Sequence, residues 1–199
     1  MKRHFTIASH CVLKPGEIPD VSFVPPLVRR RFSPLQKIFF ALANAVEKSP
    51  AESSVFSSRD GEDTLTRRIV DEFHEDGSVS PHRFSTSVYN AAPGLWSVFT
   101  KNKATYTAVA AGDDSIECGL IEMFAAENTG LYVYAEETGG GYGASFFLDD
   151  GLPGRRLEVT AGDASRDPVS FSRFVDFLSG ATGVLEGRWI TVRDVTCAG

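Results

Sequence analysis

Apolar side chains recur at helical spacing in several segments of the chain. After Ser33 they follow at intervals of three and four residues, which predicts an amphipathic helix that ends before Pro50. Ser33 is suited to cap this helix, Pro34 fits its first position, and Gln36 completes a capping box. The same criterion predicts four more helices: one from Asp60 or Asp63 to Gly77, one with Leu95, Trp96 and Phe99, one over 113–126, and one that begins at Asp167 and Pro168.

Shorter apolar runs predict strands between these helices. The most regular unit is a strand at 105–110, a turn at Gly112, the helix at 113–126 and a returning strand at 131–136. We interpret this unit as a right-handed crossover between two parallel strands. Because helices and strands alternate along the chain, the sequence predicts a layered α/β domain. The other strands are predicted at 5–13, 53–58, 144–148, 155–160 and 188–192.

The remaining segments show no hydrophobic period. Residues 14–28 are rich in proline and are predicted to form an extended connection, whereas 78–90 is predicted to be a polar loop. The glycine cluster at 139–143 is followed by a predicted strand, whereas a phosphate-binding loop is followed by a helix. The cluster therefore predicts the tip of a hairpin and not a phosphate-binding loop. Without an internal repeat, residues 1–199 are predicted to form a single domain.

Composition narrows the classes of function. The chain has 199 residues, of which 42% are hydrophobic and 15 are phenylalanine, enough to build a core without covalent staples. A net charge of -6 argues against nucleic acid as a partner. No apolar run is long enough to span a bilayer and residues 1–16 lack a signal-peptide core, so we expect a cytoplasmic protein. Cys11, Cys118, Cys197 and the four histidines have no metal-ligand spacing, so neither a metal nor a cofactor is predicted.

Two further features of the sequence are candidate functional sites. Cys118 lies more than one turn inside a predicted helix, where a small buried side chain is favoured over an activated nucleophile. The run Arg29, Arg30 and Arg31 is unusual in an acidic protein. It is suited either to an acidic partner or to local ion pairs on a solvated surface, and the sequence does not separate these two interpretations.

The strand that ends before Gly112 has the pattern of a nucleophile elbow. A residue that ends a strand just before a sharp turn into a helix lies close to the helix amino terminus, and enzymes place serine or cysteine there. Residues 107–112 read Thr-Ala-Val-Ala-Ala-Gly, so the position is held by Val109. A valine side chain cannot attack a thioester.

These motifs together resemble the β-ketoacyl synthases of the thiolase superfamily, whose elbow reads approximately Thr-Ala-Cys-Ala-x-Gly. Ser80-Pro81 and the segment 90–95, Asn-Ala-Ala-Pro-Gly-Leu, match motifs that lie upstream of the elbow in those enzymes. The resemblance covers roughly 30–136 and is closest to the β-ketoacyl synthase-like N-terminal domains, in which Arg-Arg-Arg-x-Ser precedes the first helix, as in 29–33. Members of that subfamily look like the chain length factors of bacterial aryl polyene clusters.

The resemblance implies a thiolase-like half-domain with a mixed, largely parallel sheet flanked by helices. The resemblance also shows which catalytic residues of those enzymes this chain lacks. Val109 replaces the catalytic cysteine, and no histidine follows Glu136, although the two catalytic histidines of a ketosynthase lie in its second half. We therefore expect no self-sufficient condensation chemistry and assign no catalytic residue.

The function that the resemblance implies is that of a catalytically silent chain length factor. Such a subunit pairs with an active β-ketoacyl synthase and shapes its acyl tunnel during polyketide, aryl polyene or fatty-acid-type elongation. The partner interface is predicted at Thr105, Thr107, Val109, Leu95, Trp96 and Phe99, the tunnel-shaping segment at His82, Arg83 and Phe84, and docking of an acyl carrier protein at Arg29, Arg30 and Arg31.

Some alternatives stay open. Trp96 is equally suited to be an ordinary core aromatic, and Phe84 is less suited to that role. Two alternative functions are a carrier-protein-binding module that acts without a ketosynthase and a thiol enzyme that uses Cys118. A homodimer is possible when the partner is absent, because an exposed half-domain would leave an apolar patch.

Overall fold

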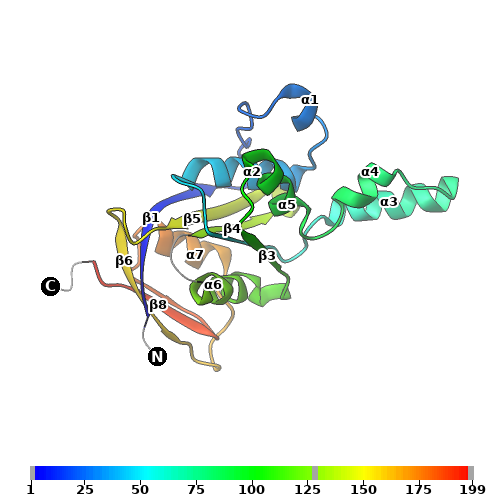
Figure 1. The fold of residues 1–199 in the computed structure, drawn as a ribbon. Coiled ribbons are helices and arrows are strands. Elements are labelled where there is room, and N and C mark those ends of the chain that lie inside the picture. Colours follow the sequence, from blue (N-terminus) through cyan, green and yellow to red (C-terminus); the bar gives the residue numbers. More distant parts are fainter. Residues whose placement is uncertain (1–2, 127–129, 197–199) are drawn as a thin grey trace.

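The fold is built on one mixed eight-stranded sheet, which a computed structural model describes for residues 3–126 and 130–196 (Figure 1). The strand order is β3-β2-β4-β5-β1-β6-β8-β7. The strands are β1 (Arg3–Leu13), β2 (Ser53–Ser57), β3 (Thr105–Val109), β4 (Gly130–Glu136), β5 (Tyr142–Leu148), β6 (Arg155–Ala161), β7 (Val184–Glu186) and β8 (Ile190–Asp194).

The parallel part of the sheet is smaller than expected. Only the pairs β2–β3 and β2–β4 are parallel, whereas the other five described pairs are antiparallel. The prediction of a mixed sheet is confirmed, and the prediction that it is largely parallel is wrong. The connection from β4 to β5 is a hairpin, which is too short for the crossover that a parallel pair requires.

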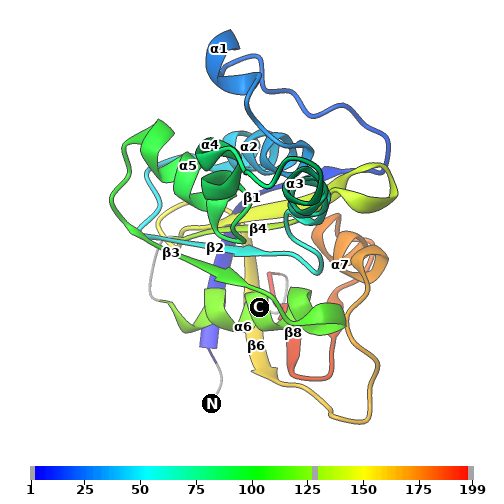
Figure 2. The ribbon, with the colours of Figure 1, turned by 90° about the vertical axis from the view of Figure 1, so that its right-hand side faces the viewer.

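Helices cover both faces of the sheet (Figure 2). On one face α2 and α5 pack with the sheet around Phe39, Phe40 and Trp96, and on the other α6 and α7 pack around Tyr132 and Phe146. The layered α/β class predicted from the sequence is therefore confirmed. The helices are α1 (Pro26–Arg29), α2 (Pro34–Val46), α3 (Asp63–Asp76), α4 (Pro81–Thr86), α5 (Ala91–Thr100), α6 (Ser115–Ala125) and α7 (Phe171–Leu178).

Local signals placed most element ends correctly. The capping box at α2 is present, because Ser33 Oγ accepts from the Gln36 N–H at 3.0 Å and Gln36 Oε1 accepts from the Ser33 N–H at 3.2 Å. Gly77 ends α3 in the left-handed region with φ 66°. The crossover strands β3 and β4 both run parallel to β2, which lies between them.

Four local predictions need correction. The expected loop at 78–90 contains α4, and the expected extended connection at 14–28 contains α1; both helices begin at a proline, which suits the first helical turn. Helix α7 begins after the cap Ser170 and not at Asp167. The final strand lies at 190–194 and pairs with the unpredicted β7. Helices α3 and α4 project together from the side of the sheet layers (Figure 1).

Candidate functional site

The elbow predicted at the end of β3 is present. Strand β3 ends at Val109, Gly112 adopts φ 56°, a short 3-10 turn follows, and α6 begins at Ser115. Ser115 Oγ accepts from the Ala111 N–H at 3.0 Å and donates to the Gly112 carbonyl at 2.8 Å. The turn is thus held closed by a side chain from the first residue of α6.

Val109 fills the elbow as a packing residue. Its half-buried side chain packs against the core under α6 and α7. Its carbonyl accepts from the Ser58 N–H at 3.4 Å and lies 2.7 Å from the Tyr89 hydroxyl. The elbow is therefore fixed to the segment that follows β2, and it presents an aliphatic group where a nucleophile would stand.

A buried carboxylate organises the same edge of the sheet. Glu136, at the end of β4, accepts hydrogen bonds from Ser58 Oγ at 3.0 Å, from the Asp60 N–H at 3.3 Å and from the Arg59 N–H. Burial raises the pKa of Glu136 above its ordinary value, while these donors oppose the shift. Burial and the neighbouring Glu136 raise the pKa of Tyr134 far above its usual range, so its hydroxyl stays protonated. Glu136 therefore fixes the loop after β2 to the end of β4.

Sequence reasoning missed this carboxylate and its partners. The signal was a charged residue at the end of the otherwise apolar strand 131–135. Gly61 completes the arrangement, because its φ is 60° and a Cβ there would lie 2.7 Å from the Tyr89 ring. The loop from Ser58 to Gly61 is thus packed between Tyr89 and Glu136.

A cavity of about 420 Å³ lies beside the elbow. Arg59 Nη1 lies 3.1 Å from Asp113 Oδ1 at its rim. None of the four histidines lines it, and the residues described here hold no group of three or more His, Cys, Asp or Glu able to bind a metal ion. Its lining includes Arg59, Gly112, Asp113, Ile116, Tyr142 and Phe171.

The cysteines offer no activated nucleophile within the described residues. Burial raises the pKa of Cys118, and the carboxylates of Asp114 and Glu117 raise it further, so its thiol is less ionised than a free one. Burial also raises the pKa of Cys11. Cys118 is only partly buried, and Cys197 lies outside the described residues.

The residues predicted at a partner interface fall into two groups. Strand β3 is an edge strand, with Thr105 exposed and Thr107 and Val109 half-buried. Trp96 is only 6% exposed within the chain itself, and its Nε1 donates to Glu47 Oε2 at 2.7 Å. Trp96 is therefore a core aromatic that no partner is needed to bury.

The helix beside β3 does present apolar side chains outward. Val98 is 76% exposed and Phe99 37% exposed, whereas Leu95 packs against the core. Tyr106 of β3 is 38% exposed. We call Val98, Phe99 and Tyr106, together with the free side of β3, the edge surface.

The predicted tunnel-shaping residues lie on α4. Phe84 is 64% exposed, and Arg83 forms an ion pair with Glu72 of α3. Gln36 Nε2 donates to the Thr86 carbonyl at 3.1 Å, which connects α4 to the start of α2. His82 is exposed on the same helix.

The arginine run forms no salt bridge in the part of the chain that the structure describes, although the Asp20 carboxylate attracts Arg29 through space. Arg29, Arg30 and Arg31 make no ion pair or side-chain hydrogen bond there. Arg29 and Arg30 line a cavity of about 670 Å³, and Arg30 and Arg31 line one of about 400 Å³. The structure thus places the run in concave surroundings.

The mixed sheet with helices on both faces and an elbow between β3 and α6 defines a thiolase-like α/β half-domain. Residues 8–137 match the family described as "Beta-ketoacyl synthase, N-terminal domain". Since this match covers more than half of the 199 residues, the chain belongs to that family, as predicted.

Solved structures share the fold. A chain of the ketosynthase ApeO in complex with its chain length factor ApeC, from Xenorhabdus doucetiae, has 19% identity and a TM-score of 0.76, over 96% of this chain and 98% of that one. The ishigamide ketosynthase/chain length factor has 12% identity and a TM-score of 0.62, over 80% and 68%. A chain of AntDE:AntF, a type II carrier protein with its hexaketide-bound ketosynthase, has 11% identity and a TM-score of 0.63, over 75% and 64%.

Two searches gave negative results. The search of curated proteins returned no match. Among the helices of the described residues, none is both long and apolar enough to cross a bilayer.

Proposed function

We propose that the chain is a catalytically silent subunit that pairs with an active β-ketoacyl synthase and shapes its acyl tunnel, in the manner of a chain length factor. The observation that carries the proposal is an intact elbow with Val109 at its nucleophile position. The chain keeps the turn of the elbow but lacks the nucleophile, so its architecture is suited to subunit assembly and not to catalysis.

The edge surface is the expected contact with the ketosynthase. An unpaired edge strand presents free N–H and C=O groups and pairs readily with another strand. Strand β3 reads Thr-Tyr-Thr-Ala-Val, without the charge or proline that usually protects an edge. The exposed side chains of Val98, on the neighbouring helix α5, and of Tyr106, on β3 itself, add apolar area that favours association.

The similar structures support a ketosynthase as the partner. Two of them are described as pairs of a ketosynthase and a chain length factor, and the third as a ketosynthase with a carrier protein. Nearly the whole of the matched chain in the first of them is covered, so this chain aligns with an entire subunit of that complex. We further expect α4, on which Phe84 is exposed, to be the segment that enters the partner's tunnel.

Co-purification tests the proposal. The tagged chain is expressed with the ketosynthase encoded beside it, and the mass and condensing activity of the purified complex are measured. We expect a one-to-one heterodimer whose activity requires the partner's cysteine and tolerates Val109→Ala. Elongation of acyl thioesters by the isolated chain, or failure to bind any neighbouring ketosynthase, would refute it.

A second candidate function is carrier-protein docking without a ketosynthase. It is favoured by Arg29, Arg30 and Arg31, which form no salt bridge among the described residues. Charge reversal of this run is then expected to abolish carrier binding, whereas the leading proposal expects subunit assembly to survive the reversal.

A further inference from the structure

A cavity of about 400 Å³ opens where α4 meets the amino-terminal ends of α2 and α3. No aspartate or glutamate lines it, although the chain as a whole has a net charge of -6. We call it the arginine pocket. Its polar lining includes Arg30, Arg31, Arg68, His82, Arg83 and Thr86.

The positive charge of the arginine pocket is only partly offset. Arg68 Nε donates to Glu72 Oε1 at 3.1 Å, and Arg83 shares the same oxygen, so one carboxylate serves two guanidinium groups. Arg30 and Arg31 are exposed and have no side-chain partner among the described residues. Two of the four guanidinium groups therefore lack a counter-ion, and the other two share one carboxylate.

Neighbouring groups reinforce this preference for an anion. Ser33 and Pro34 begin α2, and Thr64 and Leu65 lie in the first turn of α3, so the positive ends of two helix dipoles adjoin the pocket. The nearest buried carboxyl, Glu62, accepts from Ser33 Oγ at 2.9 Å. Burial raises the pKa of Glu62 to about 7, so its negative charge is reduced near neutral pH.

A second, larger cavity adjoins the arginine pocket. It measures about 670 Å³ and shares Arg30 and Pro34 with the arginine pocket. We call it the strap pocket, because residues 17–22 of the connection after β1 form one wall. The other wall is α2 with Ile38, and apolar and polar groups mix along it. Its lining combines the apolar Ile18, Val21 and Ile38 with the charged Glu17, Asp20, Lys37 and Glu137, so it is suited to an elongated group with both apolar and polar parts.

We propose that the arginine pocket binds the phosphate of an organic phosphate ester whose body lies in the strap pocket. Guanidinium groups match phosphate oxygens through paired hydrogen bonds, which makes arginine the preferred side chain for this recognition. Both cavities have volumes in the range of small-molecule sites, in contrast to a flat protein-docking surface. The site lies within one chain, so it does not depend on the proposed ketosynthase pairing.

Titration of the isolated full chain tests the site. Inorganic phosphate and butyl phosphate are titrated at constant low ionic strength, by calorimetry and by NMR of the histidine rings. We expect saturable binding, tighter for butyl phosphate, with the largest ring-signal change at His82 and none at His4 or His10. Arg30→Gln/Arg31→Gln is expected to raise the dissociation constant about ten-fold, because it removes two charge-assisted donors.

A matched variant controls for the loss of charge. Lys101→Gln/Lys103→Gln removes the same formal charge from another exposed surface and is expected to leave the dissociation constant unchanged. Equal affinity in the arginine variant and in the unchanged protein would overturn the proposal. Equal weakening by the lysine variant would also overturn it, because binding would then report only the overall charge.

Competition identifies the source of the phosphate. A carrier protein with its phosphate-bearing prosthetic arm is added to the complex with butyl phosphate. Displacement by the modified carrier, but not by the unmodified one, supports a protein-borne ester as ligand. Retention of butyl phosphate against both carriers supports a free ester as ligand.

Discussion

At the residue scale, Glu62 is an ionisable side chain whose burial disfavours its charged form. It is 3% exposed, and its Oε1 accepts from Ser33 Oγ and from Gln36 Nε2 at 2.9 and 2.8 Å. Its Oε2 is buried without a partner in the described structure. Burial, with repulsion from Glu137, raises the pKa of Glu62 to about 7.

Replacement of Glu62 by glutamine is expected to stabilise the fold at high pH. Because the pKa of Glu62 is higher in the folded chain than in the unfolded one, the free energy of unfolding falls as pH rises from about 4.5 through about 7. Glu62→Gln keeps an oxygen acceptor but removes the charge. We expect the variant to gain on the order of 2 kcal/mol at pH 8 and nothing at pH 5, measured by urea unfolding.

An exposed glutamate of the same helix provides the control. Glu75→Gln removes an equal charge at the far end of α3 and is expected to show no pH-dependent gain. If Glu62→Gln kept the slope of the unchanged protein between pH 5 and 8, the burial of this carboxyl would not be the cause of that slope.

Phe84 is the residue on which the proposed control of product length depends. Its side chain is 64% exposed on α4, which is unusual for a large aromatic without a partner. If it closes the far end of the partner's tunnel, Phe84→Ala is expected to lengthen the products of the complex, detected by mass spectrometry. Trp189→Ala removes another half-exposed aromatic near β8 and is expected to leave the lengths unchanged. An unchanged product distribution for Phe84→Ala would contradict the assignment.

At the element scale, β3 differs from the other parallel strands because it has a neighbour on one side only. Strand β2 pairs with both β3 and β4, whereas β3 pairs with β2 alone among the described residues. Helix α5 and the edge strand then form one surface, where Gly94 allows the Tyr106 hydroxyl to approach the helix. The element is folded without a partner, yet it is incompletely hydrogen-bonded.

Charge on the edge surface is expected to weaken the proposed heterodimer. Val98→Lys and Tyr106→Lys place an ammonium group where apolar area would be buried, so we expect each to raise the dissociation constant at least about ten-fold in a pull-down titration. Leu152→Lys alters a residue that is 39% exposed in the turn between β5 and β6, and serves as the control. Equal effects at the three positions would exclude β3 as the specific contact.

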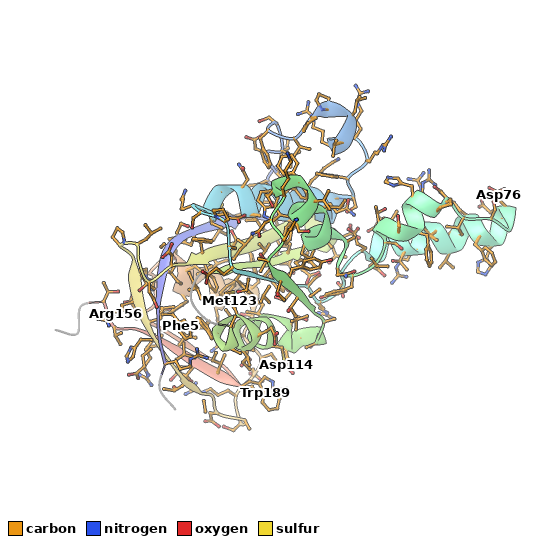
Figure 3. The ribbon with its side chains drawn as sticks, in the orientation of Figure 1. Phe5, Asp76, Asp114, Met123, Arg156 and Trp189 are labelled. Carbon is orange, nitrogen blue, oxygen red and sulfur yellow. The ribbon has the colours of Figure 1, made fainter. Side chains whose placement is uncertain are left out.

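At the scale of the whole molecule, the two helical layers share one sheet. Phe39 belongs to the core under α2 and α5, and Phe146 to the core under α6 and α7, each about 1% exposed. Strands β4 and β5 contribute side chains to both cores, because successive residues of a strand point to opposite faces. Loss of either helical layer therefore exposes one face of the shared strands, whose side chains project to both sides of the sheet (Figure 3).

A single cooperative unfolding transition is expected, which tests the prediction that residues 1–199 form one domain. Phe39→Ala and Phe146→Ala should each lower the free energy of unfolding by about 3–5 kcal/mol and shift the same transition. Calorimetry and circular dichroism measure it. Two separate transitions, each sensitive to one variant, would show that the layers unfold independently.

Local chemistry determined what could be read directly from the sequence. The capping box at Ser33, the glycine stop at Gly77 and the elbow around Gly112 follow from neighbouring residues alone. The substitution of Val109 for a nucleophile and the absence of histidine after Glu136 are facts of composition. The elbow, with Ser80-Pro81 and the segment 90–95, was enough to predict the family, and the alternation of helical and strand periods was enough to predict the α/β class.

Tertiary structure decided whatever depends on segments far apart in the chain. Two of the five antiparallel pairs exist because β1 inserts between β5 and β6, a pairing that no local period encodes. The same long-range packing buries Trp96 and gathers Arg30 and Arg68 around one pocket. Hydrophobic periodicity fixes which face of an element is apolar, but only the packed fold determines what that face meets.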